Sequence, residues 1–380
     1  MNTVFVLPYL FNALLFAEMS FFGILLVYVG WRNKGKHLYC CCSSLVAAVQ
    51  VFVIAFAITF ASPFPRYPGM FPYPYPGFMQ WWTWAWAAIT TAFFLKEKLR
   101  EPRMPAPVAA PACAPAENKA CTNDSLAPHE DGLKYKHEKA RKAFHLAGLL
   151  VVVSYFLVSP LLSVLVNEAI VKAGPAYEDV WGPISEAYFF SETNLEEAAV
   201  TLTLFALTAT VILVMLIDMF RLLAGNKYSI IMLVERRLGR VLRDKERNGP
   251  GAQDYFAISS TCAWLVGIAF GAILPAVEAI RIAIAAIVIS TLADGAAAIV
   301  GKACGRHEVR RPYDQVKSIE GFIAGFVVAF ICGIIFTSWL VAIVIAVVFL
   351  LIDYLSPPVA DNAINPVVLT VIGCLVTMLL

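Results

Sequence analysis

Long apolar runs, separated by polar or charged stretches, extend along almost the whole chain. The runs are roughly 16–28 residues long, near the ~20 residues that a helix needs to cross about 30 Å of hydrocarbon. A spanning β-barrel would instead show weakly alternating segments of about ten residues. The pattern therefore predicts an all-α fold, a polytopic transmembrane helical bundle of about ten spans. The expected spans are Val4–Val29, Leu38–Phe60, Gln80–Leu95, His145–Val166, Ala199–Ile217, Tyr255–Leu274, Val277–Val300, Gly321–Phe336, Ser338–Ile352 and Pro366–Leu380.

Composition supports this interpretation. The 380 residues are 60% hydrophobic and 15% charged, whereas soluble domains are about 45–50% apolar and about 25% charged. A soluble globular enzyme, a disordered chain and a secreted disulfide scaffold are excluded. The nine cysteines form no CxxC pair and no zinc-type spacing, so we interpret them as reduced thiols or apolar fillers.

Charge placement predicts the orientation in the membrane. Of the 29 Lys and Arg residues, 26 lie in the alternate segments 31–37, 96–142, 218–254 and 301–320. The segment 167–198 instead holds seven acidic residues and one Lys. Because basic loops stay in the cytosol, these four segments are expected there, with both termini on the other side.

Two unusual segments divide the chain. Residues 62–79 are rich in Pro and aromatic residues, a composition that suits extended backbone at the membrane interface. Residues 101–132 lack an apolar period and predict a flexible cytosolic linker. We therefore expect a three-helix membrane module over 1–100, the linker over 101–132 and a seven-helix catalytic membrane domain over 133–380.

Ionisable side chains gather at the cytosolic ends of the later spans, where they are usually paired or functional. Arg141, Lys142 and His145 can share one helical face, and Asp218 with Arg221 follows an apolar span. The segment 226–247 predicts a cationic amphipathic helix on the inner leaflet.

The segment 290–326 is the most informative. Asp294 interrupts an apolar helix, so its carboxylate is expected to have a cation or metal partner. Glycines interspersed with basic residues let backbone amides and cations approach phosphate oxygens, although the order of a Walker loop is absent. The residues of this kind are Gly301, Lys302, Gly305, Arg306 and Lys317, followed by Ser318, Glu320 and Gly321.

A last polar group, at 351–366, holds Asp353, Asp361 and Asn362. The Asp361–Asn362 pair either belongs to the site or only caps the final helix. Together the groups predict a cytosol-facing site with carboxylates, cations, a glycine-rich loop and a histidine. Phosphoryl transfer needs such a set, in which cations and metal neutralise the triphosphate.

The order RKAFH, DMFR, LADGAAAIVGKACGR, KSIEGFIAGF and DNAINP resembles that of the CTP-dependent lipid kinases, the family of dolichol kinase, phytol kinase and the yeast-type diacylglycerol kinase. The resemblance covers about residues 137–370, and Asp353 stands where many members have Glu. It implies a nucleotide-binding region comprising Asp294, Lys302, Arg306, Lys317, Ser318 and Glu320. It also matches Arg141, Lys142 and His145 to the basic motif of the family, and Asp361 with Asn362 to its late Asp-Asn pair.

The resulting hypothesis is CTP-dependent phosphorylation of a membrane polyprenol, with Mg²⁺ or a similar cation held by Asp294 and Asp361. The base that accepts the hydroxyl proton is expected to be His145 or Asp218. Alternatives are a phytol, geranylgeraniol or diacylglycerol kinase, a CTP:phosphatidate-type cytidylyltransferase and a proton-coupled transporter. The implied partners are the lipid alcohol, CTP and the bilayer, with no nucleic acid; a homo-oligomer stays open.

We expect an integral multi-pass protein of a prokaryotic cell membrane or the endoplasmic reticulum, with its active site on the cytosolic face.

Small residues near that face either let helices pack closely or leave a lateral groove for the isoprenoid chain. They are Ala147, Gly148, Gly321, Ala324 and Gly325.

Overall fold

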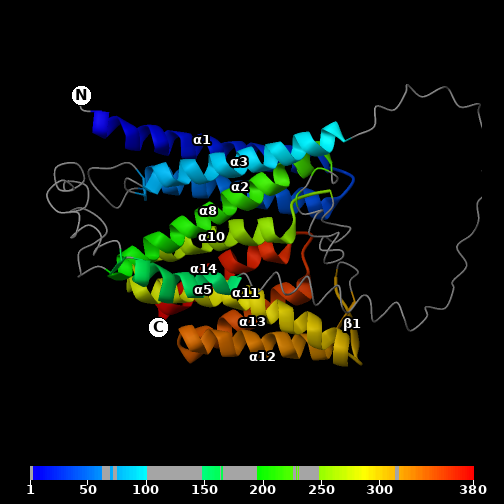
Figure 1. The fold of residues 1–380 in the computed structure, drawn as a ribbon. Coiled ribbons are helices and arrows are strands. Elements are labelled where there is room, and N and C mark those ends of the chain that lie inside the picture. The colour runs from blue at the N-terminus through cyan, green and yellow to red at the C-terminus, as the bar shows by residue number, and fades with distance from the viewer. Residues whose placement is uncertain are drawn as a thin grey trace, which may run out of the picture.

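The computed structural model describes residues 3–61, 69–71, 75–100, 148–162, 164–165, 195–225, 228, 230, 248–312 and 316–380. Within these residues the chain is a bundle of long helices with one small antiparallel hairpin (Figure 1). The elements are α1 (Thr3–Arg32), α2 (Leu38–Phe60), α3 (Tyr75–Leu99), α5 (Leu149–Val153), the π-helix η2 (Ser154–Val158), α8 (Leu195–Ala224), α10 (Ala252–Phe270), α11 (Ala276–Cys304), β1 (Glu308–Arg310), β2 (Val316–Ser318), α12 (Ile319–Phe336), α13 (Trp339–Leu355) and α14 (Asp361–Leu379).

Nine of the expected spans each fall on one of these helices, and the described part of the span His145–Val166 falls on α5 and η2. The all-α polytopic fold is therefore confirmed. Six described helices are long and apolar enough to cross a membrane, namely those within α1, α2, α8, α11, α12 and α14. The segment Leu149–Leu162 and the helix α13 are apolar but shorter. The protein is therefore a membrane protein by the length and composition of its helices.

The last helix begins earlier than its apolar pattern predicts, at Asp361 rather than at Pro366. Proline lacks the N–H that would bond to the carbonyl four residues before it. Here that carbonyl belongs to Asn362, and the Ser259 hydroxyl donates to it at 2.5 Å. Since a neighbouring helix satisfies the orphaned acceptor, Pro366 is accommodated inside α14.

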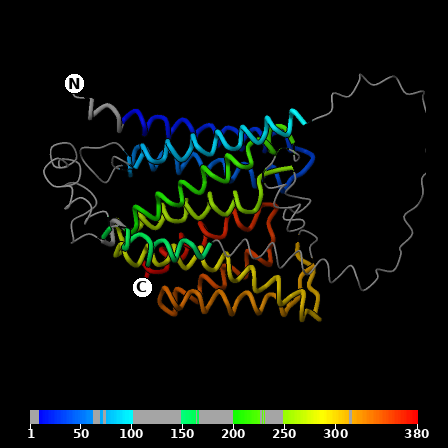
Figure 2. Tube along the Cα trace, in the orientation of Figure 1, coloured from blue at the N-terminus to red at the C-terminus, as the bar shows by residue number. Residues whose placement is uncertain are grey.

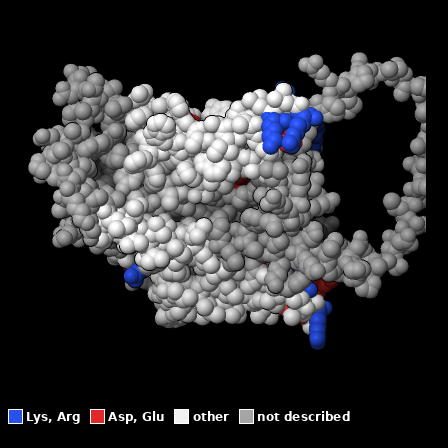
Figure 3. All heavy atoms as spheres, viewed as in Figure 1, with Lys and Arg blue, Asp and Glu red and all other residues white. Residues whose placement is uncertain are grey.

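The described parts of the basic segments lie at one end of the bundle. Helix α1 begins and α14 ends at the opposite end (Figure 2). In the space-filling view, Lys and Arg gather mainly where α3 ends and the β1–β2 hairpin lies (Figure 3). This arrangement agrees with the expected pairing of the two termini on one side. Which side faces the cytosol stays a prediction.

Helix α11 lies at the centre of the later helices and packs against α10, α12 and α14. The first three helices pack on the same bundle, with α2 against α10 and α14 and with α3 against α8. The indole of Trp82 in α3 donates to the carbonyl of Ala209 in α8 at 2.9 Å. One hydrophobic core includes residues of the first three helices and of the later helices. The division into domains stays a prediction. The linker 101–132 lies outside the described residues, as does nearly all of 226–247.

The α11–α12 contact depends on small residues. A Cβ on Gly325 would lie 3.0 Å from the Cβ of Ala297, and one on Gly321 would lie 2.8 Å from the Ala297 carbonyl oxygen. Both glycines are buried. The Cβ position of Gly148 is similarly filled, 2.3 Å from the Thr291 hydroxyl. Of the two alternatives for these glycines, the contacts favour close helix packing over a lateral groove.

Candidate active site

A pocket of about 610 Å³ lies where α11 ends, the hairpin turns into α12, α13 ends and α14 begins. Its described lining holds three cationic side chains, Lys302, Arg311 and Lys317. It also holds four acidic ones, Asp294, Glu308, Asp353 and Asp361. The sequence prediction of one site that mixes carboxylates, cations and glycines corresponds to this pocket, which unites segments 290–318 and 352–361.

Helix α11 contributes one face of the pocket. Asp294, Ala298, Gly301, Lys302 and Gly305 all line it, at intervals of one, three or four residues that keep them on one side of the helix. Asp294 and Lys302 are eight residues apart, or about 12 Å along the axis. Small residues between them leave the helix surface open to a ligand.

The glycines of this segment also bring backbones together. A Cβ on Gly305 would lie 2.2 Å from the Gly301 carbonyl oxygen and 2.6 Å from the Ser318 Cβ. Ser318, which ends β2 and pairs with Glu308 in β1, caps α12 by accepting from the Gly321 N–H at 3.1 Å. Lys317 is therefore fixed two residues before the start of α12.

The cations of the hairpin converge on Asp353 at the end of α13. Lys317 donates to the Asp353 carboxylate. The Arg311 guanidinium donates to the Asp353 carbonyl at 3.0 Å and lies 3.6 Å from its carboxylate. The side chains of Asp353, Arg311 and Lys317 are only 11%, 12% and 15% exposed. This group links the hairpin to α13 across the pocket.

Three carboxylates face this region together. Asp294 and Asp361 both line the pocket and both act electrostatically on Asp353. Asp361 opens α14, where the helix dipole favours a negative charge, and its carboxylate accepts from the Asn362 N–H at 2.9 Å. Such oxygen donors suit Mg²⁺, which proteins commonly hold by one or two carboxylates together with substrate phosphates.

Among the described residues, protein side chains alone do not form a metal-binding site. No three His, Cys, Asp or Glu side chains in this part of the chain are grouped so as to hold a metal ion. Asp294 and Asp361 therefore fit a cation that a bound triphosphate helps to ligate.

Four other predicted site residues are not among those that line the pocket. Arg306 is exposed, and Glu320 pairs with His307 at 2.7 Å. Gly321 packs against α11. Asn362 is 5% exposed, and its N–H donates to the Asp361 carboxylate. Arg141, Lys142 and His145 lie outside the described residues.

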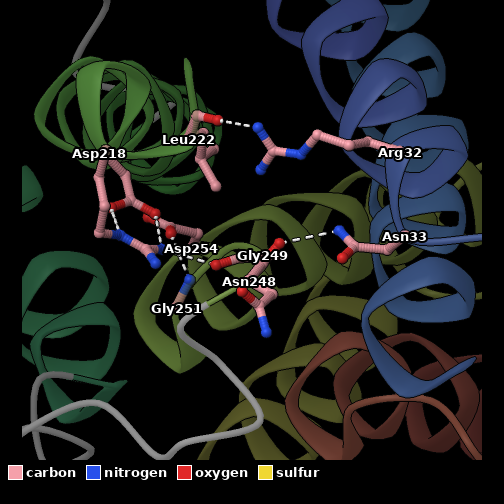
Figure 4. Close-up of polar contacts among 9 residues, drawn as sticks. Arg32, Asn33, Asp218, Leu222, Asn248, Gly249, Gly251 and Asp254 are labelled. Atoms are coloured by element: carbon pink, nitrogen blue, oxygen red, sulfur yellow. Dashed lines mark hydrogen bonds and ion pairs between the residues drawn. The ribbon is translucent and has the colours of Figure 1, made fainter. Parts of the chain in front are cut away.

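Asp218 belongs to a second, fully buried group (Figure 4). Both of its carboxylate oxygens accept hydrogen bonds from Arg221, which also donates to the Gly249 carbonyl at 2.6 Å. Asp254 lies within side-chain hydrogen-bonding reach of Asp218 and caps α10 by accepting from the Gly251 N–H at 2.7 Å. Two buried carboxyl groups around one guanidinium carry excess negative charge unless they share a proton.

The N-terminal helices contact the same region. Asn33 in the turn after α1 donates to the Asn248 carbonyl at 2.8 Å, and Arg32 donates to the Leu222 carbonyl at 2.8 Å (Figure 4). The short segment that joins Asn248 to α10 is thus held between α1 and the Asp218 group.

Sequence reasoning missed three parts of these sites. It named Lys317 and Asp353 without pairing them, and it assigned no role to Asp254 or Tyr39. Asp254 has a local signal, since it follows Gly251 by three residues at the start of a helix, the spacing of a capping box. Tyr39 lines the pocket from α2, a segment that the family resemblance does not cover, so no signal in the sequence indicated it.

The fold and the pocket define a polytopic membrane protein with a mixed-charge site at one end of its bundle. A model of the cytidylyltransferase family matches residues 138–379. The chain therefore belongs to the cytidylyltransferase family, which includes CTP-dependent lipid kinases such as dolichol kinase, and is a CTP-related lipid enzyme. The resemblance inferred from the sequence is confirmed. No curated protein and no solved structure matches the chain.

Proposed function

We propose that the protein transfers the γ-phosphate of CTP to the hydroxyl group of a membrane polyprenol of the dolichol type. The acceptor oxygen forms a bond to the γ-phosphorus, the bond from that phosphorus to the β,γ-bridging oxygen breaks, and CDP leaves. The hydroxyl proton passes to a base. The products are CDP and a polyprenyl monophosphate.

The observation that carries this proposal is the convergence of Asp294, Lys302, Lys317 and Asp361 on one pocket. These residues come from three separate segments, and all lie within the family match. A phosphoryl-transfer site needs cations near the phosphates and carboxylates that can bind a metal. The pocket also lies at an end of the helical bundle, where the head of a lipid alcohol could meet a soluble nucleotide.

Charge on the pocket wall supports a metal requirement. Its described lining carries no net positive charge, because four acidic side chains oppose three cations. A bare triphosphate would be repelled by such a wall, whereas its complex with a divalent cation would be accepted. When bound, Mg²⁺ would neutralise charge on the transferring phosphoryl group. Asp294 and Asp361 would hold it, and Lys302 and Lys317 would contact phosphate oxygens.

Of the two candidate bases, we favour His145. Asp218 is bound through both carboxylate oxygens to Arg221 and is not among the residues that line the pocket. A base must reach the proton that it removes, directly or through one water. We therefore give Asp218 a structural role beside Arg221 and Asp254. His145→Gln with an intact fold is expected to lower kcat at least tenfold, with little change in KM for CTP.

Cytidylyl transfer is the second candidate, and the family description favours it. In that reaction a lipid phosphate attacks the α-phosphorus of CTP, pyrophosphate leaves and a CDP-lipid forms. It needs no base to deprotonate an alcohol, because the attacking phosphate is already anionic. The two reactions are therefore separated by their products.

The test of the kinase proposal uses purified full-length protein with γ-labelled CTP or ATP. The acceptors are polyprenols of several lengths, phytol and diacylglycerol. We expect labelled lipid monophosphate from CTP and a polyprenol, with less than a tenth of that rate from ATP. A higher rate with phytol or diacylglycerol would show that the polyprenol is not the acceptor. A higher rate with ATP would show that CTP is not the phosphate donor.

A further inference from the structure

Helix α2 lies outside the region that the family model matches, yet it reaches the candidate active site. Tyr39 lines the pocket directly. Ser43 and Gln50 follow it by four and eleven residues, spacings that place all three on one face of a helix. This face packs against α10 and the start of α14.

The start of α14 depends on side chains from other helices. Its N-cap residue is Ala360, which makes no side-chain cap and is a poor N-cap residue. The Ala360 N–H donates instead to the Ser43 hydroxyl at 2.8 Å. Ser43 and Ala360 are both buried, at 0% and 2% exposed. The residue directly before Asp361 is thus fixed by α2.

A second bond from α2 holds the same turn. The Gln50 amide donates to the Ala363 carbonyl at 2.6 Å. Asp361 therefore lies between two backbone groups that α2 binds, at Ala360 and at Ala363. A carboxylate that helps to hold a metal must be placed within a few tenths of an ångström, and buried hydrogen bonds to its backbone supply that precision.

We propose that Ser43 and Gln50 of α2 are positioning residues that place the Asp361 carboxylate for binding of the metal–nucleotide complex. This proposal rests on the proposed function in that Asp361 is taken to contact the metal bound to CTP. The proposal gives the N-terminal module, residues 1–100, a role in binding the metal–nucleotide complex. Truncation of that module would then impair nucleotide binding as well as membrane anchoring.

The chain offers a close control in Ser44. It neighbours Ser43 on the same helix and is equally buried at 0% exposed. Its hydroxyl has no hydrogen-bond partner in the described part of the chain. Ser43→Ala and Ser44→Ala therefore remove the same atom from similar surroundings, and only the first removes a bond to the turn that carries Asp361.

The experiment measures binding of Mn²⁺ in the presence of CTP, without a lipid acceptor so that CTP is not consumed. Full-length protein in lipid nanodiscs is titrated, and free Mn²⁺ is read by electron paramagnetic resonance. We expect Ser43→Ala to raise the Kd for Mn²⁺ three- to tenfold and Ser44→Ala to change it less than twofold. Thermal unfolding of both variants shows whether lost stability accounts for the difference.

Equal Mn²⁺ affinities for the two Ser variants would overturn the proposal. If Ser43→Ala is not recovered folded, Gln50→Met decides, since it keeps the side-chain length and removes the bond to Ala363. A Kd raised at least threefold would support positioning, and an unchanged Kd would overturn it. Failure of the kinase proposal is read separately, from the product of the wild-type reaction. A wild type that binds no Mn²⁺ with CTP would overturn both proposals.

Discussion

Lys317 and Asp353 form an ion pair across the candidate pocket, joining strand β2 to the end of α13. The ammonium group of Lys317 also lies 5.2 Å from the centre of the Phe322 ring. Because both partners are mostly buried, loss of either one leaves a charge with less compensation than it has in the intact pair. The pair is therefore expected to contribute to folding stability as well as to the charge of the pocket.

We expect Lys317→Met and Asp353→Asn each to lower the free energy of unfolding by about 1–3 kcal/mol, the range for a buried polar group that loses its partner. The double variant is expected to lose less than the sum of the two, because contacting residues couple. Unfolding of all four proteins, followed in the same detergent, gives the coupling energy. Strictly additive losses would mean that the pair does not act as a unit.

The sequence predicted the helices because apolar runs of membrane length carry a strong signal. It also located much of the pocket, since Asp294, Lys302 and Lys317 lie within one short stretch. The pairing of Lys317 with Asp353 joins residues 36 positions apart, and local periodicity does not report such contacts. The role of Gly325 was equally open, because close packing and a lipid groove both require small residues. The placement of Tyr39 and Ser43 emerged only from tertiary packing of α2.

Replacement of Asp294 tests its proposed contact with the metal. Asp294→Asn keeps the side-chain size and removes the charge, so kcat/KM is expected to fall about 100-fold or more, or about 2.7 kcal/mol in transition-state stabilisation. Thermal stability is expected to change little. Steady-state kinetics at saturating Mg²⁺ measure the effect.

The control for this variant is Glu278→Gln, which removes an acidic charge from the first turn of the same helix. It lies outside the pocket lining and is expected to retain normal kinetics. Turnover near the wild-type rate in Asp294→Asn would remove the metal-binding role from this residue.

Alanine substitutions at two glycines distinguish the effect of helix packing on stability from the effect of backbone freedom. Gly325→Ala is expected to lower the free energy of unfolding by about 1–3 kcal/mol, as overpacking does, because the new Cβ would lie 3.0 Å from Ala297 and 3.3 Å from Phe349. Gly77→Ala adds the same methyl group at ordinary contact distance, 3.4 Å from the Phe11 ring. It is expected to be neutral or to gain less than about 1 kcal/mol.

Thermal unfolding of both variants, with KM for CTP and for the polyprenol, checks this comparison. Equal stability of Gly325→Ala and the wild type, together with a raised KM for the polyprenol alone, would instead favour a lipid groove at Gly325.

Orientation in the membrane can be read from native Cys304, which is exposed at the end of α11. In a variant that keeps only this cysteine, an impermeant maleimide is expected to react from the cytosolic side alone. A single cysteine at Ile273, which is 68% exposed in the turn before α11, is expected to react from the other side. Labelling of Cys304 from outside would reverse the topology and place the pocket on the wrong side for cytosolic CTP.

In the proposed reaction, the pocket transfers the γ-phosphate of CTP to a lipid alcohol. Its most direct test is a paired assay in which purified protein, Mg²⁺ and a polyprenol receive either γ-labelled or α-labelled CTP. We expect the lipid to acquire label from γ-labelled CTP only and CDP to accumulate in equal amount. Label entering a lipid from α-labelled CTP, with release of pyrophosphate, would rule out phosphoryl transfer and identify cytidylyl transfer instead.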